Sequence, residues 1–358
     1  MSQPQSSTES SQATETVFSL GAINIEEIRE EFHTPLSCSY VWDYSSANKK
    51  LERLYELGKK LNWNASIDID WSLNLDRSKS PIAKDSNPFI GFAPYEAMTR
   101  DEQINFDWHR HCWAMSQFLH GEQGALMVAS QLVSCAPTHD AKLYSASQAF
   151  DEARHVEVFS NYINQKLGLM YPVNAHLKSL LDSILVDERW DLKFIGMQVI
   201  IEGLALAAFH TIKNMTSSPL LASIVQGVIQ DEARHVAFGM IFLEEFIKAL
   251  PLSEREDRAM FAYQACVNMR DRLFEEEVFE QFGWDVEDAK KRVHGGPAMH
   301  EFRNQMFSRI IPNLSRIGLL TDSVRPLYEK IGILDYEHYD DAAHVDWKKL
   351  EQSIFQES

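Results

Sequence analysis

Apolar residues recur every three or four positions through most of the chain between residues 99 and 283. This spacing places them on one face of a helix and predicts an all-α core. Thr99 and Glu102 form a capping-box pattern before the first long helix. Ser253 and Glu256 repeat the pattern before the last one. The predicted helices span about 99–135, 139–167, 188–215, 219–250 and 253–282, with a shorter helix ending near 186.

The chain on either side of this core has a different pattern. Residues 1–16 are polar, which predicts a disordered tail. They lack the apolar stretch that a signal peptide requires. The next segment combines a helical stretch at 46–63 with a loop rich in proline, serine and aspartate. After residue 283, glycine and proline return, and shorter helices are predicted. We therefore predict four segments: a disordered tail at 1–16, an N-terminal extension of helix and loop at 17–98, a helical bundle at 99–283 and a C-terminal helical appendage at 284–358.

The six-residue string DEARHV occurs twice, at 151–156 and again at 231–236. The repeat extends upstream, because Glu122 precedes Glu152 by the same separation as Glu202 precedes Glu232. Each half therefore reads Glu, a spacer of fixed length, then E-x-x-H. Within a helical hairpin both glutamates of a half lie about 20 Å from the turn, at about 1.5 Å per residue. The repeat predicts that four carboxylates and two imidazoles meet at one level of a bundle.

The glutamates of this repeat lie in apolar surroundings, as the run IIEGLALAAF around Glu202 shows. Four ionised carboxylates in such an interior would repel one another and lose their solvation. Two divalent cations would neutralise them. Mixed carboxylate and imidazole ligands favour iron, with manganese as the second choice. The predicted ligands of two metal ions are Glu122, Glu152, His155, Glu202, Glu232 and His235.

The residues that flank these ligands are also repeated. Asp151 and Asp231 precede the glutamates of the two E-x-x-H motifs. Each aspartate is predicted to accept the free ring N–H of a metal-bound histidine, across the pseudo-symmetry axis that relates the halves. Arg154 and Arg234 would then offset the extra negative charge. The alternative for these four residues is that they face solvent as ordinary polar helix positions.

This arrangement resembles the ferritin-like di-iron carboxylate superfamily, in which two helices each give a Glu and two others each give E-x-x-H. The paired D-E-x-R-H motifs are most similar to its oxygen-activating branches: multicomponent monooxygenase hydroxylases, arylamine N-oxygenases and acyl-carrier-protein desaturases. The ribonucleotide reductase small subunit is a relative. The resemblance covers residues 100–250 and carries over the six ligands position by position. It implies a ferritin-like four-helix bundle core with extra flanking helices.

Three positions depart from individual branches of that superfamily. Phe159 stands where the reductase small subunit stores a radical on tyrosine, which argues against a radical of that type. Val228 stands where N-oxygenases tend to carry an extra histidine, one turn before the second motif glutamate. Leu206 replaces a threonine that multicomponent hydroxylases usually present. The sequence therefore matches no branch fully.

Charge and composition limit the classes of molecule that this chain is expected to bind. A net charge of −18 argues against nucleic acid and anionic membranes as binding surfaces. No run of eighteen apolar residues appears, so no membrane span is predicted. The four cysteines form no C-x-x-C pair and are predicted to be reduced, mostly buried thiols. Without a rubredoxin-like iron site in the chain, electrons must come from outside. The run Glu275, Glu276, Glu277 is predicted to be a solvated helix face.

These observations and the resemblance together predict a cytoplasmic non-haem di-iron oxygenase or oxidase of monooxygenase type. It would use O2 to hydroxylate, N-oxygenate or desaturate a small organic substrate, with electrons from an external reductase or ferredoxin. Helical bundles of this kind often pair, so a homodimer is expected. One alternative is iron oxidation and storage or peroxide detoxification, although the long flanks would hinder a ferritin shell. Another is a structural bundle with a vestigial site.

Overall fold

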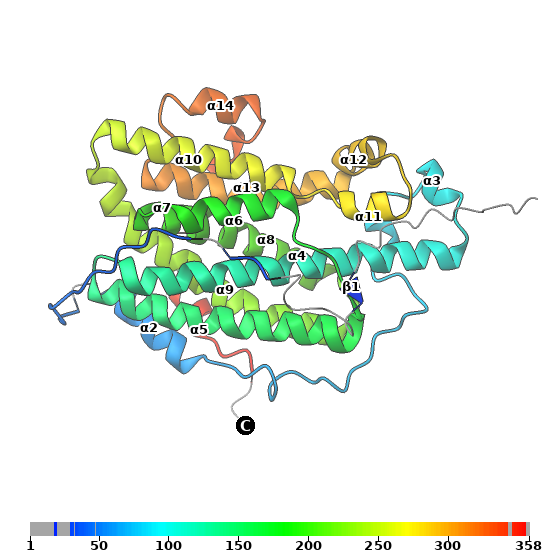
Figure 1. Cartoon of the computed structure of the whole chain (residues 1–358), viewed down its shortest axis with the longest axis horizontal. Helices are drawn as coiled ribbons and strands as arrows, with labels where there is room; N and C mark the ends of the chain where they lie inside the picture. The colour runs from blue at the N-terminus through cyan, green and yellow to red at the C-terminus, as the bar shows by residue number, and fades with distance from the viewer. Residues whose placement is uncertain (1–17, 20–28, 32, 47, 343–345, 356–358) are drawn as a thin grey trace, which may run out of the picture.

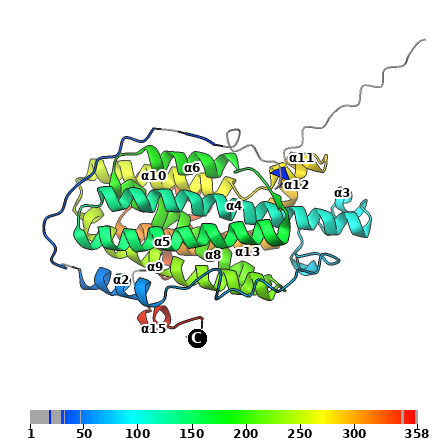
Figure 2. The same cartoon turned by 60° about the horizontal axis from the view of Figure 1, so that its bottom comes forward.

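The protein is built around long helices that lie side by side (Figures 1 and 2). The computed structural model describes residues 18–19, 29–31, 33–46, 48–342 and 346–355, so the predicted tail at 1–16 lies outside it. The core helices are α4 (Arg100–Cys135), α5 (His139–Tyr162), a continuous helix made of α7 (Trp190–Phe194), η3 (Ile195–Ile201) and α8 (Glu202–Met215), and α9 (Pro219–Ala249). Short turns join α4 to α5 and α8 to α9, and each pair packs along its length. The prediction of an all-α core is confirmed.

The predicted ends of three core helices are confirmed by their caps. Thr99 and Glu102 form the expected capping box, in which each side chain bonds the other residue's backbone N–H. Ser218 Oγ accepts a hydrogen bond from a backbone N–H in the first turn of α9. Gly168 ends the extension of α5 with a left-handed backbone, at φ 69°. Only glycine adopts that conformation without a steric cost.

The second predicted capping box is wrong. Helix α10 (Leu252–Asp271) begins after Pro251, and no side chain caps it. The carboxylate of Glu256 instead accepts hydrogen bonds from the hydroxyls of Thr321 and Ser323, which ties α10 to the loop before α14. The helix also ends about ten residues earlier than expected. The side chain of Glu256 therefore makes a tertiary contact in place of the cap that the local pattern predicted.

We expect Ser218→Ala to lower the free energy of unfolding by about 1 kcal/mol, because the first turn of α9 loses a hydrogen-bond acceptor. Ser253→Ala is the matched control and should change it by less than about 0.5 kcal/mol, since Ser253 is exposed and caps nothing. Urea denaturation of both variants measures the difference. Equal losses would contradict the assignment of the caps.

One segment of helix departs from α-helical geometry next to the repeat. Residues Ile195–Ile201 form a π-helix directly before Glu202, the first residue of α8. A π-helix bonds each N–H to the carbonyl five residues back, and such segments occur frequently at functional sites. The apolar pattern predicted the helix but not this change of hydrogen bonding. All residues of Ile195–Ile201 are buried, so the pattern marks no single helix face from which the geometry could be inferred.

Both flanks of the core pack against it. Helix α2 (Lys49–Lys60), capped by Asn48, packs on α5 and α9, and α13 (Pro297–Ile317) packs on α8 and α9. The predicted boundaries at residues 98 and 283 stay predictions.

The other elements are β1 (Phe18–Ser19), η1 (Lys84–Ser86), α3 (Ala93–Glu96), η2 (Ile163–Leu167), β2 (Leu169–Met170), α6 (Ala175–Val186), α11 (Glu276–Gln281), α12 (Val286–His294), α14 (Arg325–Lys330), η4 (Leu334–His338) and α15 (Trp347–Leu350). Strand β1 pairs antiparallel with β2.

One helix, Trp190–Met215, is long and apolar enough to cross a membrane by length and composition, although the sequence predicted none. Its whole apolar window is buried inside the protein. It is therefore the central helix of the core, covered by α9 on one side and by α10 and α13 on others. Its apolar character reflects burial on every face.

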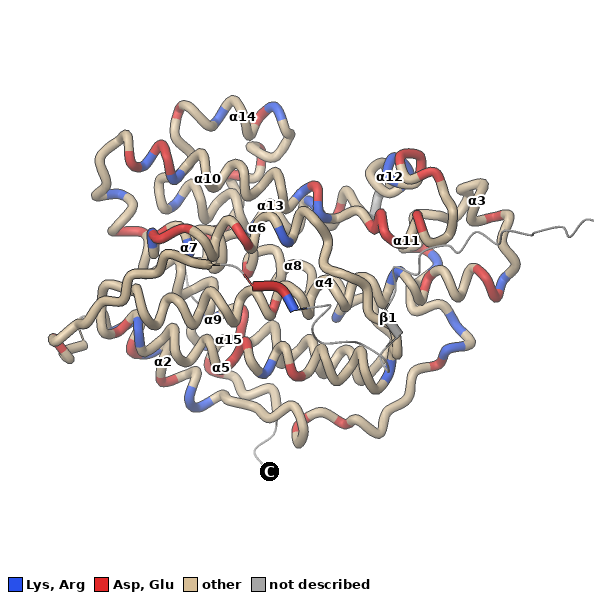
Figure 3. The backbone as a smooth tube through the Cα atoms, in the orientation of Figure 1, with Lys and Arg blue, Asp and Glu red and all other residues tan. Residues whose placement is uncertain are grey.

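Basic and acidic residues are interspersed along the described helices (Figure 3). The predicted solvated face at residues 275–277 is wrong for two of its three glutamates. Glu275 forms an ion pair with Arg110 of α4 at 2.5 Å, and Glu277 accepts a hydrogen bond from the indole of Trp113 at 2.8 Å. These contacts fix the start of α11 against α4. The four cysteines are free thiols, and all except Cys38 are buried.

Candidate metal centre

The four core helices bring the six predicted ligands together inside the bundle. Helices α4 and α8 each supply one glutamate, and α5 and α9 each supply a glutamate and a histidine one turn later. All are buried, with exposed fractions of 5% for Glu122, 2% for Glu202 and 0% for Glu152, His155, Glu232 and His235. The sequence therefore folds so that each half of the repeat delivers three side chains to one place.

The first group of ligands surrounds His155. Its Nδ1 atom lies 3.2 Å from an oxygen of Glu122 and 3.2 Å from an oxygen of Glu152. An oxygen of Glu232, from the other half of the chain, lies at the same distance. A ring nitrogen can donate one hydrogen bond at most, so three carboxylates around it are not explained by hydrogen bonding. They leave a space lined by one nitrogen and three oxygens.

The second group surrounds His235 in the same way. Its Nδ1 atom lies 3.1 Å from Glu152 and 3.2 Å from Glu232. Glu202 is somewhat farther, at 3.9 Å. Glu152 and Glu232 therefore belong to both groups, and each directs one oxygen to each histidine. Glu122 and Glu202 belong to one group each.

This geometry fits two metal ions. In each group the candidate ligand atoms all lie within 4.8 Å of one another. The Oε2 atom of Glu152 and the Oε1 atom of Glu232 are buried and accept no hydrogen bond. Buried carboxylate oxygens without partners are costly unless a cation compensates them. Two shared carboxylates, two outer carboxylates and two imidazoles are a ligand set suited to iron or manganese.

Asp151 and Asp231 contact the far side of each imidazole. Nε2 of His155 lies 3.0 Å from Asp231, and Nε2 of His235 lies 3.3 Å from Asp151. Each aspartate therefore meets the histidine of the other half. An Nε2–H that donates to the carboxylate leaves the Nδ1 lone pair directed toward the shared glutamates, which is the tautomer that a metal ligand requires.

Two arginines balance these aspartates. Nη2 of Arg154 lies 2.8 Å from Asp231, and Nη2 of Arg234 lies 3.1 Å from Asp151. Both arginines also pair with the aspartate of their own motif, at 2.5 Å. The exposed fraction of these side chains is 4% or less, so the alternative that they face solvent is wrong. They form a buried network of alternating charges beside the candidate metal site.

Residues 45–318 match the family of p-aminobenzoate N-oxygenase AurF. The chain belongs to this family. As an AurF-family protein it is a ferritin-like di-iron oxidoreductase that acts with O2 on a small molecule. The departure at Val228 therefore does not exclude the N-oxygenase branch. Val228 is fully buried on α9.

Solved structures of R2-like ligand-binding oxidases reconstituted with a Mn/Fe cofactor also resemble this AurF-family chain. One is 18% identical over 74% of this chain and 92% of its own, with a TM-score of 0.45. Another is 17% identical over 78% of this chain and 96% of its own, with a TM-score of 0.48. No curated protein matches the chain.

The structure adds polar residues that sequence reasoning missed. Nε2 of Gln148 donates to Glu152 at 3.0 Å and to Glu202 at 3.1 Å. Gln198 in turn donates to Gln148 at 3.2 Å. Each glutamine lies one turn before a candidate ligand, and Gln198 also stands in the apolar run IGMQVII, so this signal was available in the sequence. Trp63 had no such signal, because its indole N–H reaches Asp231, at 2.8 Å, from a distant part of the chain.

Burial changes the protonation of the outer glutamates of this AurF-family site. It raises the pKa of Glu122 to about 8, and the nearby carboxylates of Glu232 and Glu152 add to the shift. Burial likewise raises the pKa of Glu202 well above its ordinary value, and the same two carboxylates reinforce this. The metal-free cluster therefore holds protons at neutral pH, which cations would displace.

We expect the metal-free protein to lose stability between about pH 6 and about pH 8. A carboxyl whose pKa is raised by folding keeps its proton in the folded chain but is ionised in the unfolded chain across this range, so each rise in pH favours unfolding. Bound cations remove that penalty. The increase in Tm on adding Mn²⁺ should therefore be larger at about pH 8 than at about pH 6. Calorimetry at both pH values measures it, and equal increases would contradict the assignment.

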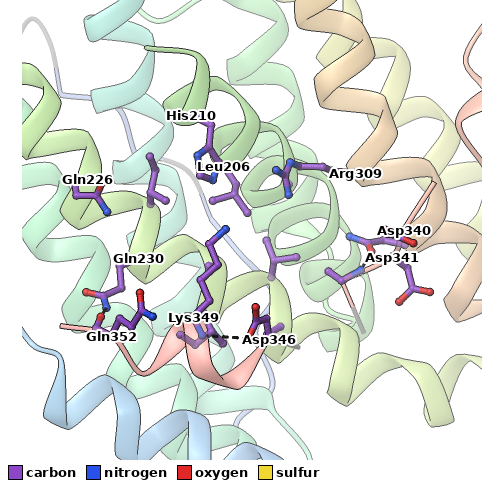
Figure 4. Close-up of a pocket in the computed structure, with 18 of the residues that line it drawn as sticks. Leu206, His210, Gln226, Gln230, Arg309, Asp340, Asp341, Asp346, Lys349 and Gln352 are labelled. Carbon is purple, nitrogen blue, oxygen red and sulfur yellow. Dashed lines mark hydrogen bonds between the residues drawn. The ribbon is translucent and has the colours of Figure 1, made fainter. Parts of the chain in front are cut away.

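Two cavities lie near the site. A small one, about 20 Å³, lies between α4 and α8 and reaches Glu122 and Glu202. A larger one, about 390 Å³, lies among α8, α9, α13 and the segment around α15. Figure 4 shows the larger cavity, with Leu206 and His210 from α8, Arg309 from α13 and Lys349 from α15. The C-terminal segment therefore forms its outer wall.

Proposed function

We propose that Glu122, Glu152, His155, Glu202, Glu232 and His235 hold two iron ions, and that the chain N-oxygenates an aromatic amine with O2. The single observation that carries this proposal is the pair of overlapping ligand groups, with two glutamates common to both. The matched family supports the choice of N-oxygenation over hydroxylation or desaturation, since its named member is an oxygenase of p-aminobenzoate. Manganese remains the second choice of metal.

Each part of the site has a task in this proposal. Bound iron supplies the redox chemistry that O2 activation requires. Asp151 and Asp231 hold the histidine rings in the ligating tautomer, and Arg154 and Arg234 hold the aspartates. The rings of Phe118, Phe159 and Phe209 pack against one another, and Phe118 lines the small cavity beside the outer glutamates, where it helps to exclude water. The small cavity between α4 and α8 reaches these glutamates.

The reaction needs two electrons from outside the chain. An amine and O2, with two electrons and two protons, give a hydroxylamine and water: one oxygen atom forms the N–O bond and the other leaves as water. We propose an external reductase or ferredoxin as the donor. We also propose a cytoplasmic homodimer, in keeping with the free thiols and with the pairing common among helical bundles.

The test is to load the protein with Fe²⁺ without oxygen, measure bound iron, and then add reductant, p-aminobenzoate and ¹⁸O2. We expect about two irons per chain and a product that carries one ¹⁸O on nitrogen. Light scattering should give a particle of about two chains. A protein that binds no iron would overturn the ligand assignment. A large shell that accumulates iron without any organic product would instead support the storage alternative.

A further inference from the structure

The candidate metal centre is most open at its two outer glutamates. Glu122 and Glu202 keep exposed fractions of 5% and 2%, whereas the other four ligands have 0%. The small cavity between α4 and α8 is lined by these same two glutamates. A molecule that reaches the centre from solvent would therefore arrive on this side.

The cavity holds one cationic side chain, Arg272, at the C-terminal end of α10. Apart from Arg272 and the outer glutamates, its lining is apolar or carries an amide. Arg272 has an exposed fraction of only 8%. The one hydrogen bond that its guanidinium makes within the described chain is a weak contact with Met269 Sδ at 3.8 Å. It forms no ion pair with any described carboxylate.

The other buried arginines are all paired. Arg110 meets Glu275, Arg258 meets Asp191 at 2.8 Å, and Arg154 and Arg234 meet the aspartates described above. Burying a guanidinium without a counter-ion is unfavourable, which is why such groups are almost always compensated. Burial accordingly lowers the pKa of Arg272 to about 10, and no carboxylate opposes that shift. At neutral pH the side chain therefore stays charged without a carboxylate partner.

We propose that Arg272 binds a carboxylate on the organic substrate and so holds the rest of the molecule toward Glu122 and Glu202. This inference rests on the proposed function. A guanidinium presents parallel N–H groups that match a carboxylate bidentately, and an enclosed site strengthens such a pair. The ligand class is an aromatic acid whose reacting group lies at the opposite end from its carboxylate.

The cavity must widen to accept a ring. Its volume of about 20 Å³ holds roughly one water molecule. Gly121 of α4 lines it, and a Cβ built there would meet nothing within 4 Å. The half-buried Phe118 beside it is the side chain best placed to move. Rearrangement of Phe118 over the bare backbone at Gly121 would make the room.

The larger cavity is a weaker candidate for binding the acid. Its cations, Arg309 and Lys349, are exposed, so water already solvates them. The same cavity is lined by Asp340, Asp341 and Asp346 (Figure 4), which offset its positive charge. Arg272 is buried, and no described carboxylate forms an ion pair with it. Arg309 therefore serves as a matched control.

The experiment measures the binding of 4-aminobenzoate and of its neutral analogue 4-aminobenzamide to Mn²⁺-loaded full-length protein by calorimetry. The unsubstituted protein should prefer the acid by about 10- to 100-fold. Arg272→Gln should remove that preference and leave the affinity for the amide unchanged, whereas Arg309→Gln should alter neither. Arg272→Lys, which keeps the charge but not the bidentate geometry, should lose part of the preference.

Equal affinity of the unsubstituted protein for acid and amide would overturn the inference, as would loss of the preference in Arg309→Gln alone. If Arg272→Gln fails to fold, an unchanged preference in Arg272→Lys overturns it instead. Binding needs no turnover, which separates this inference from the proposed function. An Arg272-dependent preference without any N-oxygenated product would refute the reaction and support the binding site.

Discussion

Glu232→Gln should empty both metal positions, lowering bound iron from about two ions per chain to less than one. One oxygen of Glu232 faces His155 and the other faces His235, at 3.2 Å in both cases. A neutral amide removes a charge from both groups at once. Turnover should fall by more than the roughly 10- to 100-fold that is typical when an outer hydrogen-bonding partner of a metal ligand is lost.

Two matched variants make this result specific. Glu202→Gln alters a glutamate that contacts His235 alone, so it should empty one position and spare part of the other. Glu157→Gln changes an exposed glutamate on the same helix as Glu152 and should leave the iron content unchanged. Iron analysis of the three purified variants measures the order. If Glu232→Gln and Glu202→Gln retain equal iron, the assignment of shared and outer glutamates is wrong.

Arg234→Met should lower the free energy of unfolding of the metal-free protein by about 3–5 kcal/mol, the cost of breaking a buried ion pair. Arg234 has an exposed fraction of 0% and pairs with both Asp151 and Asp231. Without Arg234, only Arg154 remains to compensate the negative charge of the two buried aspartates. The aspartates would then hold the histidine rings less firmly, so iron affinity should fall as well.

The control for this prediction is an arginine that pairs at the surface. The side chain of Arg189 is 41% exposed and pairs with Asp187 and Asp257. Arg189→Met should cost about 1 kcal/mol or less, because water screens such pairs. Urea denaturation of both variants gives the comparison. A similar small loss in Arg234→Met would show that the buried network contributes little to folding.

The placement of the ligands could be predicted because the sequence repeats both the ligand residue types and the spacing between them. Two E-x-x-H motifs, each at the same separation from an upstream glutamate, fix the level of every ligand once hairpins form. The sequence did not show which glutamates are shared. That depends on how far each helix is rotated about its axis, and small changes in packing decide it.

Other features lay outside the reach of local patterns. Trp63 lies just after α2 and Arg272 just after α10. Both reach the site because segments that are distant in the sequence pack together. The Ser253 and Glu256 pattern failed because Thr321 and Ser323 compete for the same carboxylate. Propensity describes what a segment can do alone, whereas these outcomes depend on neighbours that the segment meets only in the folded chain.

Gln148 has a consequence for the symmetry of the centre. It donates to Glu202, and so acts on the position near His235. The corresponding place on α9 is Val228, which offers no donor to the position near His155. Two identical hairpins would give both ions the same surroundings. The two halves of a single chain can differ in sequence, so the surroundings of the two ions can differ. The two irons should therefore differ in reduction potential and exchange rate, so that one is the first to be oxidised and the first to be lost.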